Sequence, residues 1–217
     1  MTAGDGDGAE GPGGAGELRP FGDAAWRIEL PRHPRRGVLE SLRAVPRVVD
    51  AVVCERHALV TFAPDAPPAR DALLAEVARA LAAPLDASNG REHLVRVRYD
   101  GADLDEVARA TGLAVAEVVA RHAAAAYEVA FVGFLPGFAY LRGLDPRLVV
   151  ARRSTPRTRV PALSVAIAGP YAGVYPFATP GGWSLLGTAV GFTPFDAARG
   201  AALAVGDRVR FVGEPAS

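Results

Sequence analysis

The sequence has 217 residues, and its 24 basic and 24 acidic side chains give a formal net charge of zero. This neutral balance gives no electrostatic argument for binding nucleic acid or an anionic membrane. All the basic residues are arginine, so the chain itself cannot supply a Schiff-base lysine, a biotinyl-lysine or a Walker-type phosphate-binding lysine.

Residues 1–20 are mostly Gly, Ala, Asp and Glu, a composition that cannot bury a core, and we expect a disordered leader there. The leader has no basic start followed by an apolar run, so it does not resemble a secretory signal. The longest uncharged apolar run, 129–141, is too short to span a membrane and is interrupted by Pro136. These patterns predict a soluble cytoplasmic protein without a membrane partner.

Residues 21–90 are predicted to form a small α/β domain. The expected elements are a strand at 26–30, a helix at 38–45, strands at 48–53 and 59–62, and a helix after Pro68 that places Leu73, Leu74, Val77 and Leu81 on one face. This order, β-α-β-β-α, gives most of a ferredoxin-like split β-α-β unit. A strand at 94–97 could complete this unit or begin a second domain.

The rest of the chain, 91–214, is predicted to be mostly β. Asp103 is a good N-cap with Glu106 three residues later, which indicates a helix through residue 110 that starts with a capping box. A second helix is expected at 115–124. After Tyr127 many short β-type runs separated by Gly and Pro turns predict a barrel or a sandwich.

The stretch 133–183 places aromatic residues beside Pro-Gly turns at both of its ends. Such turns have a defined shape, so the rings could form the walls of a cleft, although packing in the core is an equally good interpretation for at least half of them. Between the turns, four arginines lie close to prolines, and we weigh a carboxylate or phosphate site there evenly against a solvated loop.

His122 could act as a general acid or base, but a helix-end histidine favoured by the helix dipole is the simpler interpretation of the sequence. Ser164 and Ser184 lack the nucleophile-elbow pattern of a serine hydrolase. A single cysteine and the absence of a His-x-x-x-His pair exclude a structural zinc site, and we expect no metal.

Several linked motifs run through the second half of the sequence. They are Gly133-Phe134-x-Pro136-Gly137-Phe138-x-Tyr140-Leu141, Arg153-x-x-Pro156-Arg157, Val160-Pro161, Ser164-Val165-x-Ile167-Ala168-Gly169, Tyr175-Pro176 and Thr179-Pro180-Gly181-Gly182-Trp183, preceded by Tyr99-Asp100-Gly101-x-Asp103-Leu104, His122 and Tyr127. Together they resemble the signature of one family, which comprises the B-type subunit of 5-oxoprolinase, allophanate hydrolase subunit 1 and KipI-type proteins and is related to carboxyltransferase domains. The resemblance covers residues 94–213.

The resemblance implies a small α/β N-terminal domain followed by a cyclophilin-like, mostly-β barrel, with the strand at 94–97 in the barrel. It also implies an enzyme subunit that is active only in a heteromeric, ATP-dependent 5-oxoprolinase, an amidohydrolase that converts the cyclic amide 5-oxo-L-proline to L-glutamate. Two alternatives come with it, namely a KipI-like inhibitor of a sensor histidine kinase, and a subunit of an allophanate hydrolase or urea carboxylase-type system.

The implied cofactor is ATP, bound in the complex. The implied partners are a larger cyclophilin-like subunit, which corresponds to the C-type subunit of 5-oxoprolinase or to allophanate hydrolase subunit 2, and a third subunit. His122, Arg153 and Arg157 are the candidate catalytic residues. The residues expected to line a substrate or partner cleft are Gly133, Phe134, Pro136, Gly137, Phe138, Tyr140, Ser164, Tyr175, Pro180, Gly181, Gly182 and Trp183.

Three departures from the family pattern fall in or near these motifs. Ala151 stands where the family usually has a proline, and Leu163 stands where it usually has a glycine, which matters if that position needs a positive φ. The segment 187–194 lacks an arginine that the family usually carries and is longer by a few residues.

Overall fold

The computed structural model describes residues 17–30, 36–82 and 90–214, which group into two compact units, one on each side of a boundary between Pro84 and Leu85. The residues 1–16 of the expected leader lie outside the described part. The end of that leader differs from the prediction, because Leu18–Pro20 form a strand and Leu18 packs into a core.

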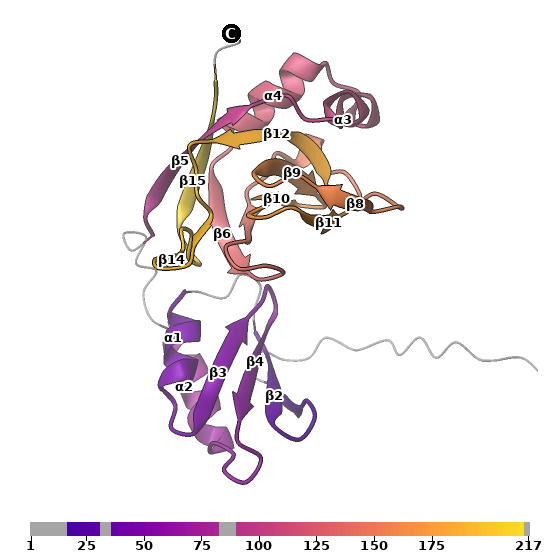
Figure 1. Cartoon of the computed structure of the whole chain (residues 1–217). Coiled ribbons are helices and arrows are strands. Elements are labelled where there is room, and N and C mark those ends of the chain that lie inside the picture. Colours follow the sequence, from indigo (N-terminus) through magenta and orange to yellow (C-terminus); the bar gives the residue numbers. More distant parts are fainter. Residues whose placement is uncertain (1–16, 31–35, 83–89, 215–217) are drawn as a thin grey trace, which may run out of the picture. The chain divides into compact units, whose positions relative to one another are not determined.

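The first unit is an antiparallel sheet covered by two helices (Figure 1). Its elements are β1 (Leu18–Pro20), β2 (Ala25–Glu29), α1 (Arg36–Ala44), β3 (Val48–Val53), β4 (His57–Phe62) and α2 (Arg70–Ala82). The strand order is β1-β2-β4-β3, so β1 takes the edge position beside β2. The predicted order β-α-β-β-α is present in the structure, with β1 added before it.

The helices of this unit form because their apolar residues recur at helical spacing and meet the sheet. Val38 and Leu42 of α1, four residues apart, are fully buried, as are Leu73 and Val77 of α2. They pack against Ile28 and the other inward side chains of β2, β3 and β4 in one core.

The second unit is built around a closed seven-stranded barrel (Figure 1). Its elements are β5 (Glu92–Arg98), α3 (Leu104–Thr111), α4 (Val115–Ala124), β6 (Tyr127–Val132), β7 (Ala139–Arg142), the 3-10 helix η1 (Pro146–Leu148), β8 (Arg157–Val160), β9 (Ser164–Ala168), β10 (Tyr171–Val174), β11 (Thr179–Gly181), β12 (Ser184–Val190), β13 (Phe195–Asp196), β14 (Gly200–Ala201) and β15 (Arg208–Gly213). The barrel order is β10-β7-β6-β15-β5-β12-β9.

The strand that the sequence could not assign, now β5, belongs to the barrel. It pairs in parallel with β15 and antiparallel with β12. The strands β8 and β11 lie outside the barrel and pair with each other, as do β13 and β14. Among the described residues no helix is long and apolar enough to cross a membrane.

Strand β9 explains how the unit holds two apolar layers at once. All five of its residues are buried, because Val165 and Ile167 face the barrel interior while Ala166 and Ala168 face a second cluster outside it. A strand that is covered on both faces reads as a continuous apolar run, as this one does. The second cluster contains Phe138, Tyr175 and Trp183, and the candidate site forms on it.

Candidate functional site

Beside the second cluster lies a pocket of about 250 Å³ with predominantly aromatic and turn residues in its wall. Its lining residues are Phe134, Phe138, Tyr140, Arg152, Pro156, Tyr175, Pro180, Gly181, Gly182 and Trp183. They come from the β6–β7 turn, β7, the segment before β8, the end of β10, and β11 with the turn into β12. Eight of the twelve residues predicted to line a cleft therefore meet in one cavity.

Phe138 is the centre of the aromatic wall. Its ring makes edge-to-face contacts with Tyr140 at 5.0 Å and with Tyr175 and Trp183 at 5.4 Å between ring centroids. This is the favoured geometry for aromatic pairs, and it fixes the rings relative to one another. Phe138, Tyr175 and Trp183 are buried, so the sequence alternatives of core and cleft are both correct for these rings.

Phe134 sits at the edge of the pocket in an unusual backbone conformation. Its φ is +71°, a value that a bulky residue rarely adopts, and its ring contacts that of Phe138 at 5.4 Å. The side chain is nevertheless 56% exposed. A strained residue that presents an aromatic ring to solvent beside a pocket is typical of a functional site.

The Tyr175 hydroxyl is one of two phenol groups in the pocket lining, the other being that of Tyr140. Burial raises the pKa of Tyr175, while the backbone N–H of Trp183, which hydrogen-bonds to the phenol, and the charge of Arg152 act in the opposite direction. A Cβ atom at Gly181 would lie 2.5 Å from the hydroxyl oxygen, so only glycine allows the phenol this position.

Arg152 is the cation of the pocket. Its guanidinium carbon lies 5.9 Å from the centre of the Trp183 ring, within the range of a cation–π contact. The side chain is exposed, and no carboxylate of the described residues forms an ion pair with it. In the sequence this arginine is only one of a cluster of four, and the family motif points to its neighbours Arg153 and Arg157 as catalytic candidates.

Arg153 and Arg157 are instead paired with acidic side chains of the α3 region. Arg153 donates to Asp103 at 3.2 Å and to Glu106 at 2.7 Å, and Arg157 donates to the same Asp103 oxygen. Both are absent from the lining of the aromatic pocket. Their guanidinium groups hold the segment before β8 against α3, so the structure does not bring them to the cleft where the sequence placed them.

Asp103 connects the segment before β8 to α3 and to β12. Its carboxylate is 2% exposed and accepts a further hydrogen bond from the backbone N–H of Leu185 at 2.7 Å. We call Asp103, Arg153 and Arg157 the carboxylate clamp. The sequence correctly placed Asp103 at the N-cap position of α3, but the expected capping box is absent, because this side chain makes no cap hydrogen bond and Glu106 binds Arg153.

His122 lies in the barrel core, away from the residues that line the pocket. Its ring stacks on Phe211 at 4.7 Å, and its Nδ1 hydrogen-bonds with the Tyr99 hydroxyl at 2.8 Å. Its Nε2 is buried and has no hydrogen-bond partner among the described residues. Burial lowers the pKa of His122 to about 3, so the ring is neutral near pH 7 and does not present a charge to a ligand.

The other predicted cleft residues have structural positions. Ser164 is buried and donates its hydroxyl to the carbonyl of Pro161 at 2.8 Å. Gly133, Pro136 and Gly137 shape the β6–β7 turn but are not in the pocket lining. Gly137 has a φ of +82°, and a Cβ there would lie 2.6 Å from the carbonyl oxygen of Pro194.

Leu163 adopts the conformation for which the family glycine would be suited. Its φ is +64°, and its backbone N–H donates to the carbonyl of Tyr175 at 2.7 Å. A left-handed conformation costs a residue with a Cβ atom about 1–2 kcal/mol. The leucine side chain packs against the barrel core, and that burial offsets part of this cost.

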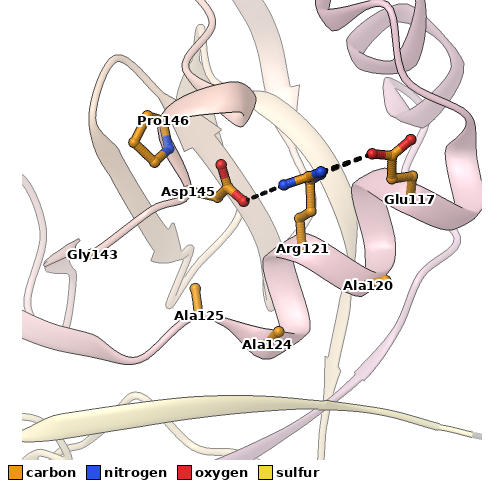
Figure 2. A pocket seen from close by; sticks show the side chains of 8 residues that line it. All are labelled: Glu117, Ala120, Arg121, Ala124, Ala125, Gly143, Asp145 and Pro146. Atoms are coloured by element: carbon orange, nitrogen blue, oxygen red, sulfur yellow. Dashed lines mark hydrogen bonds and ion pairs between the residues drawn. The ribbon is translucent and has the colours of Figure 1, made fainter.

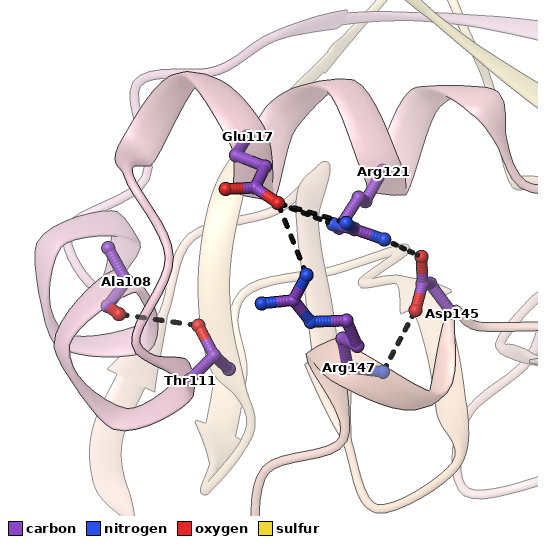
Figure 3. A network of polar contacts seen from close by, with 6 residues as sticks. All are labelled: Ala108, Thr111, Glu117, Arg121, Asp145 and Arg147. Carbon is purple, nitrogen blue, oxygen red and sulfur yellow. Dashed lines mark hydrogen bonds and ion pairs between the residues drawn. The ribbon is translucent and has the colours of Figure 1, made fainter.

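A second, larger cavity of about 650 Å³ lies between α4 and the β7–η1 segment (Figure 2). Arg121 bridges Glu117 and Asp145, each at 2.9 Å, and Arg147 contacts both of these acids (Figure 3). The backbone N–H of Arg147 and the guanidinium of Arg121 lower the pKa of Asp145. Because these charges satisfy one another and the rest of the lining is mainly alanine, glycine and proline, the network anchors α4 to η1 and gives no reactive group.

The chain matches the model of the family "carboxyltransferase domain, subdomain C and D" over residues 17–203. Among curated proteins, the B-type subunit of 5-oxoprolinase from Escherichia coli O157:H7 is 49% identical over 123 residues, which are 54% of this chain and 56% of that protein. The protein of the same name from Haemophilus influenzae is 42% identical over 129 residues, 58% of this chain and 61% of that protein. The chain thus matches little more than half the length of these relatives.

Solved structures show the same fold. TTHA0988 superposes with a TM-score of 0.76 at 34% identity, covering 93% of this chain and 41% of that one. PH0987 of Pyrococcus horikoshii, described as uncharacterised, has a TM-score of 0.54 at 30% identity and covers 91% and 97% of the two chains. The urea amidolyase of Kluyveromyces lactis has a TM-score of 0.71 at 18% identity, covering 91% of this chain and 15% of that one, and shows the fold alone.

Proposed function

The chain belongs to the family of the carboxyltransferase domain, subdomains C and D, and we propose that it is a subunit of a heteromeric ATP-dependent 5-oxoprolinase. The activity is the conversion of 5-oxo-L-proline, ATP and water to L-glutamate, ADP and phosphate. Relatives named as the B-type subunit of 5-oxoprolinase, at 42–49% identity, support this proposal. We also propose that the two units are separate domains, a ferredoxin-like one followed by a cyclophilin-like barrel.

The observation that carries the proposal is the aromatic pocket. Residues of the six linked sequence motifs either line this pocket or pack and hydrogen-bond around it. The pocket offers an aromatic wall, two phenols (Tyr140 and Tyr175) and one guanidinium, which suit the binding of a small amide. Its lining contains no Asp, Glu, His, Cys or Lys side chain. The role that we assign to this chain is therefore to bind, orient and shield the substrate, while the acid–base groups come from a partner subunit.

Neither of the two pockets described above fits ATP. The aromatic pocket, at about 250 Å³, is smaller than the roughly 300–1,000 Å³ typical of sites for drug-sized ligands. The larger cavity has one lining arginine, Arg121, which is already paired with Glu117 and Asp145 and so is not available to a triphosphate. We therefore assign ATP to a partner subunit and derive no step of the reaction through it on this chain.

A partner would be the larger cyclophilin-like subunit, together with a third subunit. The ring of Phe134, exposed at the edge of the pocket, is where we place part of the contact. Phe134→Ser should weaken assembly at least tenfold in a titration of the partner, whereas Phe21→Ser, which removes an equally exposed ring from the first unit, should leave it unchanged. Equal effects of the two substitutions would remove Phe134 from the interface.

The test of the function is reconstitution. The chain is co-expressed with the larger subunit and the third subunit encoded beside it, and the purified complex is assayed for ATP-dependent release of glutamate from 5-oxoproline. We expect activity that requires all the subunits and ATP. A complete and well-assembled complex that releases no glutamate would contradict the proposal.

A second candidate is a KipI-like inhibitor of a sensor histidine kinase. The absence of an acid–base side chain from the pocket lining favours it, because such a pocket can bind without catalysing. An autophosphorylation assay with a co-purifying kinase distinguishes the two, since only the regulator should inhibit at a stoichiometric ratio. A third alternative, a subunit of an allophanate hydrolase or urea carboxylase-type system, predicts turnover of urea-derived substrates in the same reconstituted complex.

A further inference from the structure

The arginines beside the aromatic pocket differ in whether they are paired with a carboxylate of the protein. Arg153 and Arg157 donate to Asp103, which is almost completely buried. Arg152 precedes them, lines the pocket and forms no ion pair with the described residues. A guanidinium that lines a cavity and has no carboxylate partner in the protein can donate hydrogen bonds to the carboxylate of a ligand.

The position of Arg152 suits a planar acid. Its guanidinium carbon lies over the Trp183 ring at 5.9 Å from the ring centre, a cation–π contact that uses none of its N–H groups. Those N–H groups can form two parallel hydrogen bonds with a carboxylate. The buried rings of Phe138 and Tyr175, which meet edge-to-face, line the same pocket and give an apolar surface for the remainder of a ligand.

The size of the pocket and its single cation limit the ligand further. A volume of about 250 Å³ admits a small ring and excludes an extended molecule. A phosphate is usually held by several cations or by backbone N–H groups at a helix N-terminus, and the lining contains one arginine and no helix. A single bidentate fork matches a carboxylate better.

We propose that Arg152 binds the carboxylate of a small, flat-ringed acid whose ring lies against the aromatic wall of this pocket. The inference rests on the proposed function for its choice of ligand, 5-oxoproline, which combines a carboxylate with a flat lactam ring. Arg152 thus selects acids over neutral amides at a site where the sequence motifs pointed to Arg153 and Arg157.

A binding experiment on the full chain tests the proposal without ATP or turnover. The chain has two tryptophans, so Trp26→Phe leaves Trp183 as the reporter beneath Arg152. Fluorescence is then titrated at millimolar concentrations with 5-oxoproline, with 2-pyrrolidone, which is the same ring without the carboxylate, and with inorganic phosphate. We expect saturable binding of 5-oxoproline and at least tenfold weaker binding of the other two.

Substitutions in the same background identify the group responsible. Arg152→Gln should weaken 5-oxoproline binding by about 10- to 100-fold, the range of a charge-assisted hydrogen-bonded pair. Arg152→Lys, which keeps the charge but loses the planar fork, should have an intermediate effect. Arg159→Gln is the matched control, because Arg159 is an exposed arginine of β8 that does not line the pocket.

Several outcomes would overturn the inference. They are no saturable response to 5-oxoproline, equal binding of 2-pyrrolidone or phosphate, and equal effects of Arg152→Gln and Arg159→Gln. Loss of partner assembly with unchanged ligand binding in Arg152→Gln would also overturn it and would assign the arginine to the interface.

The reconstituted complex separates this inference from the proposed function. In an active complex, Arg152→Gln should raise the KM for 5-oxoproline about tenfold or more with a smaller effect on kcat, because the lost contact holds the substrate before reaction. An active complex with an unchanged KM contradicts the inference and leaves the function intact. An inactive complex whose chain still binds 5-oxoproline through Arg152 supports the inference and contradicts the function.

Discussion

The carboxylate clamp and the aromatic pocket use neighbouring arginines of one segment in opposite ways. In the clamp, Arg153 and Arg157 converge on the buried carboxylate of Asp103 and connect the segment to α3 and, through Leu185, to β12. In the pocket, Arg152 faces the Trp183 ring and remains unpaired with any acid of the described residues. One residue of separation thus distinguishes a structural cation from a candidate ligand-binding one.

The two kinds of arginine differ because an acidic side chain lies within reach of Arg153 and Arg157, whereas the pocket lining contains none. A buried carboxylate needs hydrogen bonds and charge partners, and Asp103 obtains them from two arginines and a backbone N–H. The N–H groups with which Arg153 and Arg157 hold this carboxylate are not available to a ligand, although Nε of Arg153 and Nη1 of Arg157 have no hydrogen-bond partner among the described residues. The pocket lining has no acid, so its arginine is available. The predictions below test this division of roles.

The largest effect is expected at the centre of the clamp. Asp103→Asn keeps the shape of the side chain but leaves two guanidinium groups without their buried partner, which should lower the free energy of unfolding by about 3 kcal/mol. Urea denaturation measures the loss. Asp105→Asn, an exposed carboxylate of the same helix, should change stability by less than about 0.5 kcal/mol. Similar losses in the two variants would mean that Asp103 is not a structural centre.

The pH dependence of stability should show that buried, neutral His122 contributes to the stability of the fold. Its pKa is about 3 in the folded protein and near 6.5 when unfolded, so the unfolded state binds more protons between these values. The stabilisation is complete above pH 6.5 and is lost as the pH falls below it, by up to about 1.4 kcal/mol per pH unit.

Denaturation at pH 6.5, 5.5 and 4.5 measures this slope. His122→Gln, which keeps a hydrogen-bond acceptor near Tyr99, should flatten it, while His57→Gln at an exposed position should leave it unchanged. A wild-type slope in His122→Gln would show that His122 is not the group that titrates.

Matched substitutions of Arg157 and Arg152 should differ in their effect on the free energy of unfolding. Arg157→Gln removes one partner of Asp103 and should destabilise the protein by about 1–2 kcal/mol. Arg152→Gln removes a cation with no acidic partner and should change stability by less than about 0.5 kcal/mol. Thermal or urea unfolding of the two variants makes the comparison. A larger loss for Arg152→Gln would reverse the assignment of the two arginines.

The smallest effect concerns the backbone that supports the pocket. Leu163 is held at positive φ and hydrogen-bonds to Tyr175, so glycine should be more stable than alanine at this position by about 0.5–1 kcal/mol. Comparing Leu163→Gly with Leu163→Ala cancels most of the loss of leucine packing that both share. If alanine were equal or better, the positive φ would not be a cost at this position.

Much of the local structure was predictable because it depends on periodicity. The apolar spacing of Val38 and Leu42 predicted α1, and the short β-type runs after Tyr127 predicted strands such as β9. The short strand β1 was missed, because three residues next to a glycine-rich segment carry too little pattern. Its position depends on pairing with β2, which is a property of the sheet.

The sequence allowed the aromatic lining of the site to be predicted, but not which of its arginines lines the pocket. Proline and glycine beside aromatic residues fix local turn shapes, so the sequence offered Phe134, Phe138, Tyr175 and Trp183 as cleft walls or as core, and in the structure all four line the pocket. Only the tertiary structure decided which arginine serves that cavity, because this depends on Asp103, which lies about 50 residues away in the sequence. Ion pairing is decided by which side chains meet in space, and sequence spacing alone does not contain that information.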